Sequence, residues 1–522
     1  MGPRSFVPVA DRVSTVRPVD RLRGIPTPST GDVIAGISVA LVAIPQSLAY
    51  AELAGLPAQF GLYATALPSL LAAIFVSSKY LQTGPVALTA LLTFGALEAL
   101  AEPFSVDYIS LAALLALLVG LIRVMLGLLR IGGIAYLLSE PVLMGFTTGA
   151  AILILSSQLP KVFDVAARGD GVLADAWQAL VSPEEWQWQA LAFSAMTFVL
   201  FFGGRRVHKL FPGVLVAVIV GVVISEMGDY GGAIVGELDG GFISLNFDFP
   251  LGSIGDLLLP AFAIALVGFA EPSSIARTFA AEERLPWNAN KEMVSQGIAN
   301  LASALSGAFP VGGSFSRSSL NRLAGATSAW AGAISGAFVL LALPLTPMLE
   351  RLPRAILGAI VVGAVLKLIN WRGLYGLLHE SYPQAVVGIG TLVATLASAP
   401  RVERGVLAGI GLAVGVHLFR EMTVSAESER EGDTVIVRPH GVLWFASVPQ
   451  VERSIRQQLV EHEEIFHVVI DLGAVSRLDY TAAASLARIV GELRSADVRV
   501  EIVNVNPGSR RGVRVHIDGL DD

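Results

Sequence analysis

The sequence predicts a polytopic α-helical membrane protein that carries a small α/β domain at its C-terminal end. Of the 522 residues, 53% are hydrophobic and 15% are charged, and the mean hydropathy is +0.65. The last 102 residues contain 28 charged residues but no lysine. Long apolar runs followed by a charge-rich tail are typical of a membrane domain joined to a soluble domain.

About fourteen membrane segments are expected, seven in each half of the membrane domain. In the first half they lie near 33–51, 53–78, 84–99, 108–129, 133–159, 187–204 and 212–226. In the second half they lie near 256–275, 289–308, from 314 onward, and near 327–347, 354–369, 381–399 and 404–420. An odd number of crossings requires the two repeats, about 32–227 and 256–420, to insert with opposite topology.

The two ends of the chain have a different character. Residues 1–31 carry five arginines and no apolar run, so we expect a cytoplasmic arm and not a cleavable signal peptide. Residues 421–432 are expected to be an acidic linker. In residues 433–522, strands alternate with helices, which predicts a small α/β domain. Its expected strands are 434–438, 441–446, 466–472 and 498–505, and its expected helices are 448–462 and 481–494.

Composition excludes several classes of protein. The absence of cysteine excludes disulfides, thiol catalysis and cysteine-bound metals, and the seven histidines have no ligand spacing. The net charge of −7 gives no indication of nucleic-acid binding. Neither a nucleophile–base pair nor a phosphate loop occurs. We therefore expect neither an enzyme nor a protein with a cofactor, apart from a coupling ion such as H+ or Na+.

One candidate site centres on Arg317, in the stretch 310–325 between two apolar runs. A cation at membrane depth costs roughly 2.5–3.5 kcal/mol even on the lenient insertion scale. Two glycines break the incoming helix before a serine that is expected to cap the next helix, Ser314. The first-turn N–H groups of Phe315, Ser316 and Arg317 are then left without intrahelical partners. A positive helix end beside an arginine predicts an anion site. The alternative is an ordinary helix boundary with a snorkelling arginine.

A second interrupted helix begins at Thr83-Gly84-Pro85-Val86, at the matching place in the first half. Pro85 suits a first helical turn, and a cap at Thr83 or Gly84 would leave the N–H groups of Val86 and Ala87 free. Short segments broken by glycine or proline in both halves indicate a transporter site. Taken alone, this segment could also be a loop before a helix.

The sequence resembles the SulP anion transporters, the sulfate permease family, over nearly its whole length. Four motifs carry the resemblance: AIPQSLAYAELAGLPAQFGLY at 43–63, TGPVA at 83–87, GSFSRS at 313–318 and VIDLGAVSRLDYTAA at 469–483. The last of these resembles the STAS domain that the family carries at its C-terminus. The resemblance implies a core (helices 1–4 and 8–11) that moves like an elevator against a gate (helices 5–7 and 12–14). It also implies a homodimer.

Carried over to this sequence, the resemblance implies particular site residues. The anion would lie near Gln46, Tyr50, Pro85, Val86, Ser316 and Arg317. Glu271 falls where bacterial relatives keep a carboxylate linked to proton or sodium coupling. It closes an uncharged run, 257–270, so a purely structural ion pair with Arg317 or another buried base is the alternative.

The STAS-like segment departs from its family at the phosphorylatable serine motif, where Asp479-Tyr480-Thr481-Ala482 stands instead. Thr481 is then either a helix N-cap or a regulatory acceptor. A cytoplasmic partner of this domain is also expected.

The leading hypothesis is a secondary transporter of small anions in the bacterial inner membrane, with both chain ends in the cytoplasm. Sulfate is the first choice, followed by bicarbonate or a dicarboxylate. A passive anion channel, or a membrane sensor with the STAS-like domain as its output, stays open as an alternative.

Overall fold

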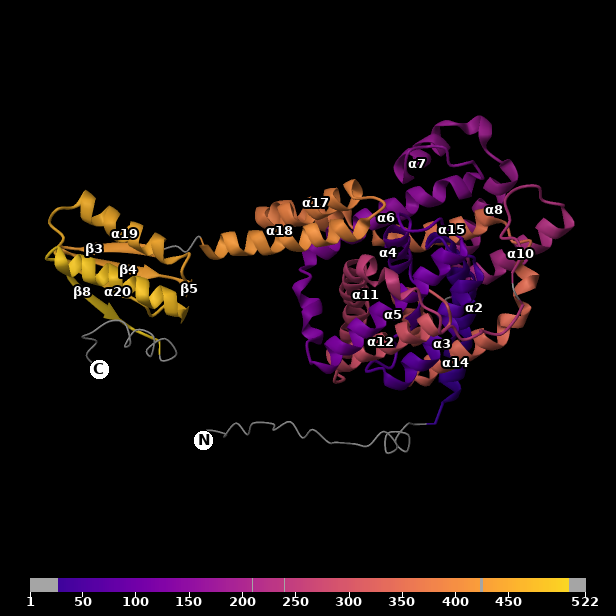
Figure 1. The fold of residues 1–522 in the computed structure, drawn as a ribbon, viewed down its shortest axis with the longest axis horizontal. Coiled ribbons are helices and arrows are strands. Elements are labelled where there is room, and N and C mark those ends of the chain that lie inside the picture. Colours follow the sequence, from indigo (N-terminus) through magenta and orange to yellow (C-terminus); the bar gives the residue numbers. More distant parts are fainter. Residues whose placement is uncertain (1–26, 209, 239, 423–425, 507–522) are drawn as a thin grey trace. The chain divides into compact units, whose positions relative to one another are not determined.

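The computed structural model describes residues 27–506 except 209, 239 and 423–425, so the expected N-terminal arm lies largely outside the described residues. The chain forms two compact units that divide between Ile410 and Gly411. The first unit is a bundle of apolar helices, and the second is a small sheet covered by helices (Figure 1). Among the described residues, seven helical segments are long and apolar enough to cross a membrane.

Eight helices of the first unit pack together and are called the core group here. Helix α12 packs on α5 and α3, and α14 packs on α3 and α2, while α11 and α13 contact α5 and α2 respectively. Their bounds are α2 Thr30–Leu53, α3 Gln59–Phe75, α4 Ala87–Leu97, α5 Val106–Leu128, α11 Ile254–Glu283, α12 Ala289–Leu305, α13 Phe315–Leu323 and α14 Trp330–Ala342.

The remaining long helices form a second set, called the gate group, in which α6 contacts α15 and α17, and α15 contacts α8. These helices are α6 Glu140–Phe163, α8 Trp188–Phe198, α10 Gly213–Met227, α15 Arg354–Val365, α17 Tyr382–Ala397 and the part of α18 (Val402–Met422) that precedes Gly411. Shorter helices complete the unit: η1 Gly132–Leu137, α7 Val172–Val181, η2 Pro183–Glu185, η3 Val199–Gly203, α9 Gly204–Val207, η4 Leu251–Ser253, η5 Leu343–Leu349, η6 Leu366–Leu368 and α16 Trp371–Glu380. The two groups meet mainly where α2 contacts α15 and α10 and where α4 contacts α6.

Small residues allow close helix contacts within each group. A Cβ atom on Gly61 would lie 1.8 Å from the carbonyl oxygen of Ser47, where α3 crosses α2. A Cβ atom on Gly145 would lie 2.1 Å from the carbonyl oxygen of Gly388, where α6 crosses α17. Small residues at such crossings let helix backbones approach in the absence of a hydrophobic driving force.

The predicted segments of the membrane domain each correspond to a helix of the structure. The expected start of the fifth segment at 133 was wrong, because 132–137 form the short helix η1 and α6 begins at Glu140. The expected start of the second segment at 53 was also too early, since α3 begins at Gln59. Helices α7 and α16 were not expected.

The second unit contains a four-stranded sheet with the strand order β3-β4-β6-β8 and a separate parallel pair, β5-β7. Strand β3 is antiparallel to β4, while β4, β6 and β8 are parallel. The strands are β3 Ala426–Glu431, β4 Thr434–Pro439, β5 Gly441–Leu443, β6 His467–Asp471, β7 Val475–Leu478 and β8 Arg499–Val503. The helices are α19 Val448–Glu461 and α20 Tyr480–Ser495.

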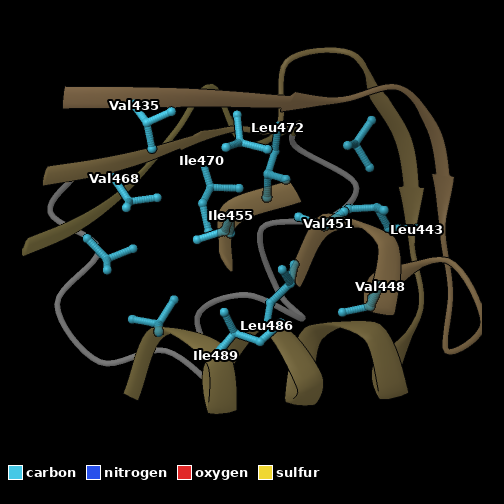
Figure 2. Packing of buried hydrophobic residues seen from close by; sticks show 14 of the residues in the cluster. Val435, Leu443, Val448, Val451, Ile455, Val468, Ile470, Leu472, Leu486 and Ile489 are labelled. Atoms are coloured by element: carbon cyan, nitrogen blue, oxygen red, sulfur yellow. The ribbon is translucent and has the colours of Figure 1, made fainter. Parts of the chain in front are cut away.

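The core of this unit lies between the sheet and its helices. Figure 2 shows Val468 and Ile470 of the sheet above Ile455 of α19 and Leu486 of α20. Alternate residues of β4 and β6 are buried, as expected for strands with one face on the core. The two helices and four expected strands are therefore confirmed, although β5 is shorter than expected.

Residues 426–431, expected within an acidic linker, form strand β3 instead. Every residue from Ala426 to Glu431 has a partner on β4. The strand lies at the edge of the sheet, and its side chains are mostly exposed. Its charged residues are compatible with an edge position, where charge discourages pairing with other chains.

Candidate functional site

The two interrupted helices meet. Before α4 and α13 begin, the chain forms a two-residue antiparallel pairing of β1 (Thr83–Gly84) with β2 (Gly312–Gly313). Thr83 pairs with Gly313 and Gly84 pairs with Gly312. Because α4 starts at Ala87 and α13 starts at Phe315, both helix N-termini lie within three residues of this pairing. Their positive ends are therefore brought to one place.

The start of α4 differs from the expectation. Val86, and neither Thr83 nor Gly84, is the N-cap residue, and it offers no side-chain acceptor. The Thr83 hydroxyl instead accepts a hydrogen bond from the Gln296 amide at 2.7 Å, and Pro85 lies before the helix and not in its first turn. A helix without a side-chain cap leaves first-turn N–H groups available to a ligand.

The start of α13 has the expected cap. The Ser314 hydroxyl accepts a hydrogen bond from the backbone N–H of Arg317 at 3.4 Å. Ser318 of the same helix accepts a hydrogen bond from the N–H of Gln82 at 2.9 Å, and the Ser314 N–H donates to the Gln82 carbonyl. These bonds fix α13 to the segment that leads into α4.

Arg317 lies at the junction of the two breaks and is only 1% exposed. Its Nη2 donates to the Pro85 carbonyl at 2.6 Å, across the pairing. A Cβ atom on Gly84, where φ is 153°, would lie 3.0 Å from Nη1, so this glycine makes room for the guanidinium group. The Nε–H group has no hydrogen-bond partner among the described residues. A buried donor without a partner is costly, which favours a ligand at this position.

Two residues of α2 lie on the same helix face near this junction. Tyr50 is 7% exposed, and its side chain lies within electrostatic range of both Arg317 and Glu271. Gln46 is buried one turn earlier. Residues four apart on a helix lie on the same side, so both face the same neighbours.

Glu271 of α11 is half-buried and also reaches the start of α13. Its carboxylate accepts a hydrogen bond from the backbone N–H of Phe315, and it interacts electrostatically with Arg317. The Phe315 N–H was expected to be free for an anion, but Glu271 occupies it. The phenyl ring of Phe315 stacks on Phe279, with the ring centroids 6.5 Å apart.

The remaining residues that were expected to be functional differ in solvent exposure. Pro85, Val86 and Ala87 are buried, whereas Ser316 is exposed in the first turn of α13. In the second unit, Thr481 is exposed, and it is not the N-cap: Asp479 caps α20 by accepting a hydrogen bond from the N–H of Ala482 at 2.6 Å.

Arg123 of α5 was missed in the sequence. It is fully buried, and it donates to the carbonyls of Ile264 and Ala265 on α11 and of Val311 before β2, at 3.0–3.1 Å. A Cβ atom on Gly268 would lie 2.5 Å from its Nη2. This arginine therefore ties the helix that carries Glu271 to the break that carries Arg317. The indication in the sequence was a lone cation within the apolar run 108–129.

We expect Arg123→Met to destabilise the protein. Each hydrogen bond from a charged donor contributes about 1.5–3 kcal/mol, and methionine keeps the length of the side chain but makes none of them. Denaturant unfolding of the purified protein measures the loss. Arg130→Met, at an exposed position just beyond α5, is the control. Wild-type stability of the Arg123 variant would show that these bonds do not hold α11 in place.

The sequence was compared with protein families, curated proteins and solved structures. The profile of the sulfate permease family matches residues 30–390, and that of the STAS domain matches residues 425–518. A probable sulfate transporter of Mycobacterium tuberculosis is 34% identical over 510 residues, covering 93% of this chain and 90% of that protein. The chloroplastic sulfate transporter 4.1 of Arabidopsis thaliana is 29% identical over 515 residues, covering 91% of this chain and 75% of that protein.

Solved structures share the fold. The murine Slc26a9 anion transporter in an inward-facing state matches with a TM-score of 0.86 at 20% identity, covering 98% of this chain and 95% of that chain. The transmembrane domain of the cyanobacterial bicarbonate transporter BicA matches with a TM-score of 0.62 at 24% identity, covering 74% of this chain and 97% of that domain.

Apolar helices in two groups, with two broken helices meeting at a buried arginine, place the chain in the class of multi-pass membrane transporters. The family match covers most of the helical unit. The chain belongs to the sulfate permease family and carries a STAS domain at its C-terminal end.

Proposed function

We propose that this protein is a secondary active transporter of small inorganic anions, with sulfate as the first choice. The observation that carries the proposal is the β1–β2 pairing, which brings two helix N-termini to the buried guanidinium group of Arg317. Helix N-termini and arginine side chains are both well suited to binding oxyanions in proteins. The names of the relatives in Mycobacterium and Arabidopsis support sulfate.

The residues of the site have separable roles in this proposal. Arg317 supplies charge and the unpartnered Nε–H group, and the N-cap Val86 and the first residue of α4, Ala87, supply backbone donors. Tyr50 and Gln46 line the face of α2 that lies toward the site. Ser314 and Phe315 position α13 through its cap and through Glu271, and the exposed hydroxyl of Ser316 adds a donor.

Glu271 is the proposed coupling group. Its carboxylate lies within electrostatic range of Arg317, so a proton or a sodium ion on Glu271 changes the charge that the anion meets. Moving the loaded site through an apolar medium costs less free energy when its charges are balanced than when they are not. Transport against a gradient would then require Glu271 to take up its ion on one side and release it on the other.

The proposed movement is that of an elevator. The core group carries the breaks, Tyr50 and Glu271, and it contacts the gate group at few places. The gate group would stay fixed while the core group shifts. A homodimer in the bacterial inner membrane, with both chain ends in the cytoplasm, is part of the same proposal.

Bicarbonate or a dicarboxylate is the alternative substrate, and a passive anion channel is the alternative mechanism. The purified protein is reconstituted into liposomes, and uptake of labelled sulfate, bicarbonate, chloride and a dicarboxylate is measured with and without proton and sodium gradients. Concentrative uptake of one anion under a gradient supports the proposal. Flux that only follows the anion's own gradient would identify a channel.

A fixed negative charge at the helix starts is expected to abolish uptake. Val86→Glu and Ser316→Glu would place a carboxylate where the anion is bound, and like charges repel. Val86→Gln and Ser316→Gln are the matched neutral controls and isolate the charge from the size of the side chain. Uptake measurements on variants with normal membrane insertion decide the result. A glutamate variant that transports as well as its glutamine counterpart would place the helix starts outside the site.

The STAS domain is proposed to regulate transport and not to be the output of a sensor. Removing residues 426–522 deletes the domain from its first strand onward. Anion flux in the full-length protein that persists at a changed rate in the truncated protein supports a regulated transporter, whereas absence of flux from both proteins, each folded and inserted, favours the sensor. Binding of a cytoplasmic partner, or modification of the exposed Thr481, would act through this domain.

A further inference from the structure

A buried carboxylate of the core group contacts two basic residues of the gate group. Glu52, near the C-terminal end of α2, has a side chain only 3% exposed. Its Oε2 lies 2.9 Å from the Lys161 Nζ on α6, and its Oε1 lies 3.3 Å from the Arg354 Nε at the start of α15. The two bases are on helices that pack against each other. One carboxylate of the core group therefore contacts basic side chains on two helices of the gate group.

This ion triad differs from the other ion pairs of the helical unit. Among the described residues of this unit, Glu282 and Glu283 of α11 pair with Arg322 and Lys79, and Arg168 pairs with Glu185 of η2. Arg351, in the connection between η5 and α15, pairs with Glu226 near the end of α10 and with Asp229 just beyond that helix. None of these pairs joins a helix of the core group to a helix of the gate group. The Glu52 triad does.

The triad is also close to the proposed anion site along the chain. Tyr50 and Glu52 are two residues apart on α2, and two residues turn a helix by about 200°. The Tyr50 side therefore faces Arg317 and Glu271, while the Glu52 side faces α6 and α15. The same helix end bears a residue of the site and the charged contact with the gate.

From this geometry we infer that Glu52, Lys161 and Arg354 form a latch that holds the core group to the gate group in the conformation described, and that opens in each transport cycle. The inference rests on the proposed function, because it assumes that the two groups move. Removing a buried charge from its partners is strongly unfavourable, so a shift of α2 requires water or another charge to replace them. The bases are 25% and 40% exposed, so water reaches them once Glu52 withdraws.

The first test reverses charges. Glu52→Lys and Lys161→Glu, taken singly, are each expected to lower sulfate exchange about tenfold or more, because like charges then face each other in a buried contact. Combining the two with Arg354→Glu puts one base against two acids, so that opposite charges meet again at both contacts, and is expected to return exchange to within about threefold of wild type. The matched control is a more exposed ion pair, Glu226→Lys near the end of α10 and Arg351→Glu in the connection before α15, whose single variants should stay within about twofold of wild type.

The second test separates a latch from a static contact. The chain contains no cysteine, so Glu52→Cys with Lys161→Cys gives the only two thiols for a short bifunctional maleimide. Cross-linking is measured by mass spectrometry, which needs no transport. We expect the linked protein to keep its thermal stability and lose anion exchange, while the unlinked double variant retains exchange.

Three results would each contradict the proposal that these residues form a latch. One is a charge-swapped protein, folded and inserted, that is no more active than the single reversals. The second is a linked protein that exchanges anions as fast as the unlinked one. The third is failure of the two thiols to cross-link, which would mean that the groups are not in contact at this point. If wild type moves no anion of the panel but the thiols do cross-link, the proposed function fails and the contact stands.

Discussion

Replacing Arg317 with alanine is expected to weaken sulfate binding about tenfold to hundredfold, because each charge-assisted hydrogen bond contributes about 1.5–3 kcal/mol. The variant loses the guanidinium charge, the unpartnered Nε–H group and the bond to the Pro85 carbonyl. Arg317→Lys should recover only part of the loss, since an ammonium group restores the charge but not the planar fork that bridges to Pro85. Concentration dependence of sulfate uptake in liposomes gives the half-saturation values.

Arg322→Ala is the control for this prediction. Arg322 is on the same helix, but it is partly exposed and pairs with Glu282 and Glu283 on the surface of the core group. A surface ion pair contributes little, so uptake should stay near wild type. An unchanged half-saturation value in Arg317→Ala, at normal expression and thermal stability, would remove the arginine from the anion site.

Replacing Glu271 with glutamine is expected to abolish concentrative uptake while anion exchange continues. The glutamine side-chain oxygen can still accept the hydrogen bond from the Phe315 N–H, so the start of α13 keeps its partner. The variant mimics the protonated carboxyl permanently, and it can neither release a proton nor hold a sodium ion by charge. Exchange across equal sulfate concentrations and accumulation under imposed proton and sodium gradients are measured on the same vesicles.

The alternative for Glu271 is a purely structural partner of Arg317, and it predicts a different result. Loss of the carboxylate would then leave a buried cation uncompensated, and the variant would be unstable and lose exchange as well. Glu282→Gln, on an exposed turn of the same helix, controls for the loss of one negative charge. Gradient-driven accumulation by Glu271→Gln at the wild-type level would exclude the coupling role.

Much of the fold follows from local sequence properties. Apolar runs of the right length predict the helices, and strand–helix alternation predicts the α/β core built on residues such as Val435 and Ile470. The cap at Ser314 and the placement of Arg317 beside a helix start were also predictable. A serine before a helix indicates an N-cap, and a cation in an apolar run indicates a functional site.

The exact cap of α4 and the pairing of the two breaks could not be predicted from local properties. Thr83 is a good capping residue, but its hydroxyl is taken by Gln296, more than 200 residues away. The use of the Phe315 N–H by Glu271 depends in the same way on how α11 lies against α13. Tertiary contacts of this kind override the local preference of a capping residue.

Other features were missed because their local patterns resemble something simpler. Glu52 directly follows the first expected segment, 33–51, and Arg123 lies within the expected segment 108–129, and neither position indicates that the side chain is buried by long-range partners. Strand β3 has no hydrophobic face, since it lies at the sheet edge, so its composition indicated a linker. An edge strand without apolar alternation gives little periodic pattern to detect.

The short ladder at the two breaks also constrains how this chain can vary in length. Two residues, Pro85 and Val86, separate the ladder from α4, and one residue, Ser314, separates it from α13. Connecting segments ordinarily tolerate insertions and deletions. Here one added or deleted residue on either side would rotate a helix start by about 100° and remove the Arg317 fork from the Pro85 carbonyl. Segments that look like loops in the sequence are therefore among the places where the chain can least accept a change in length.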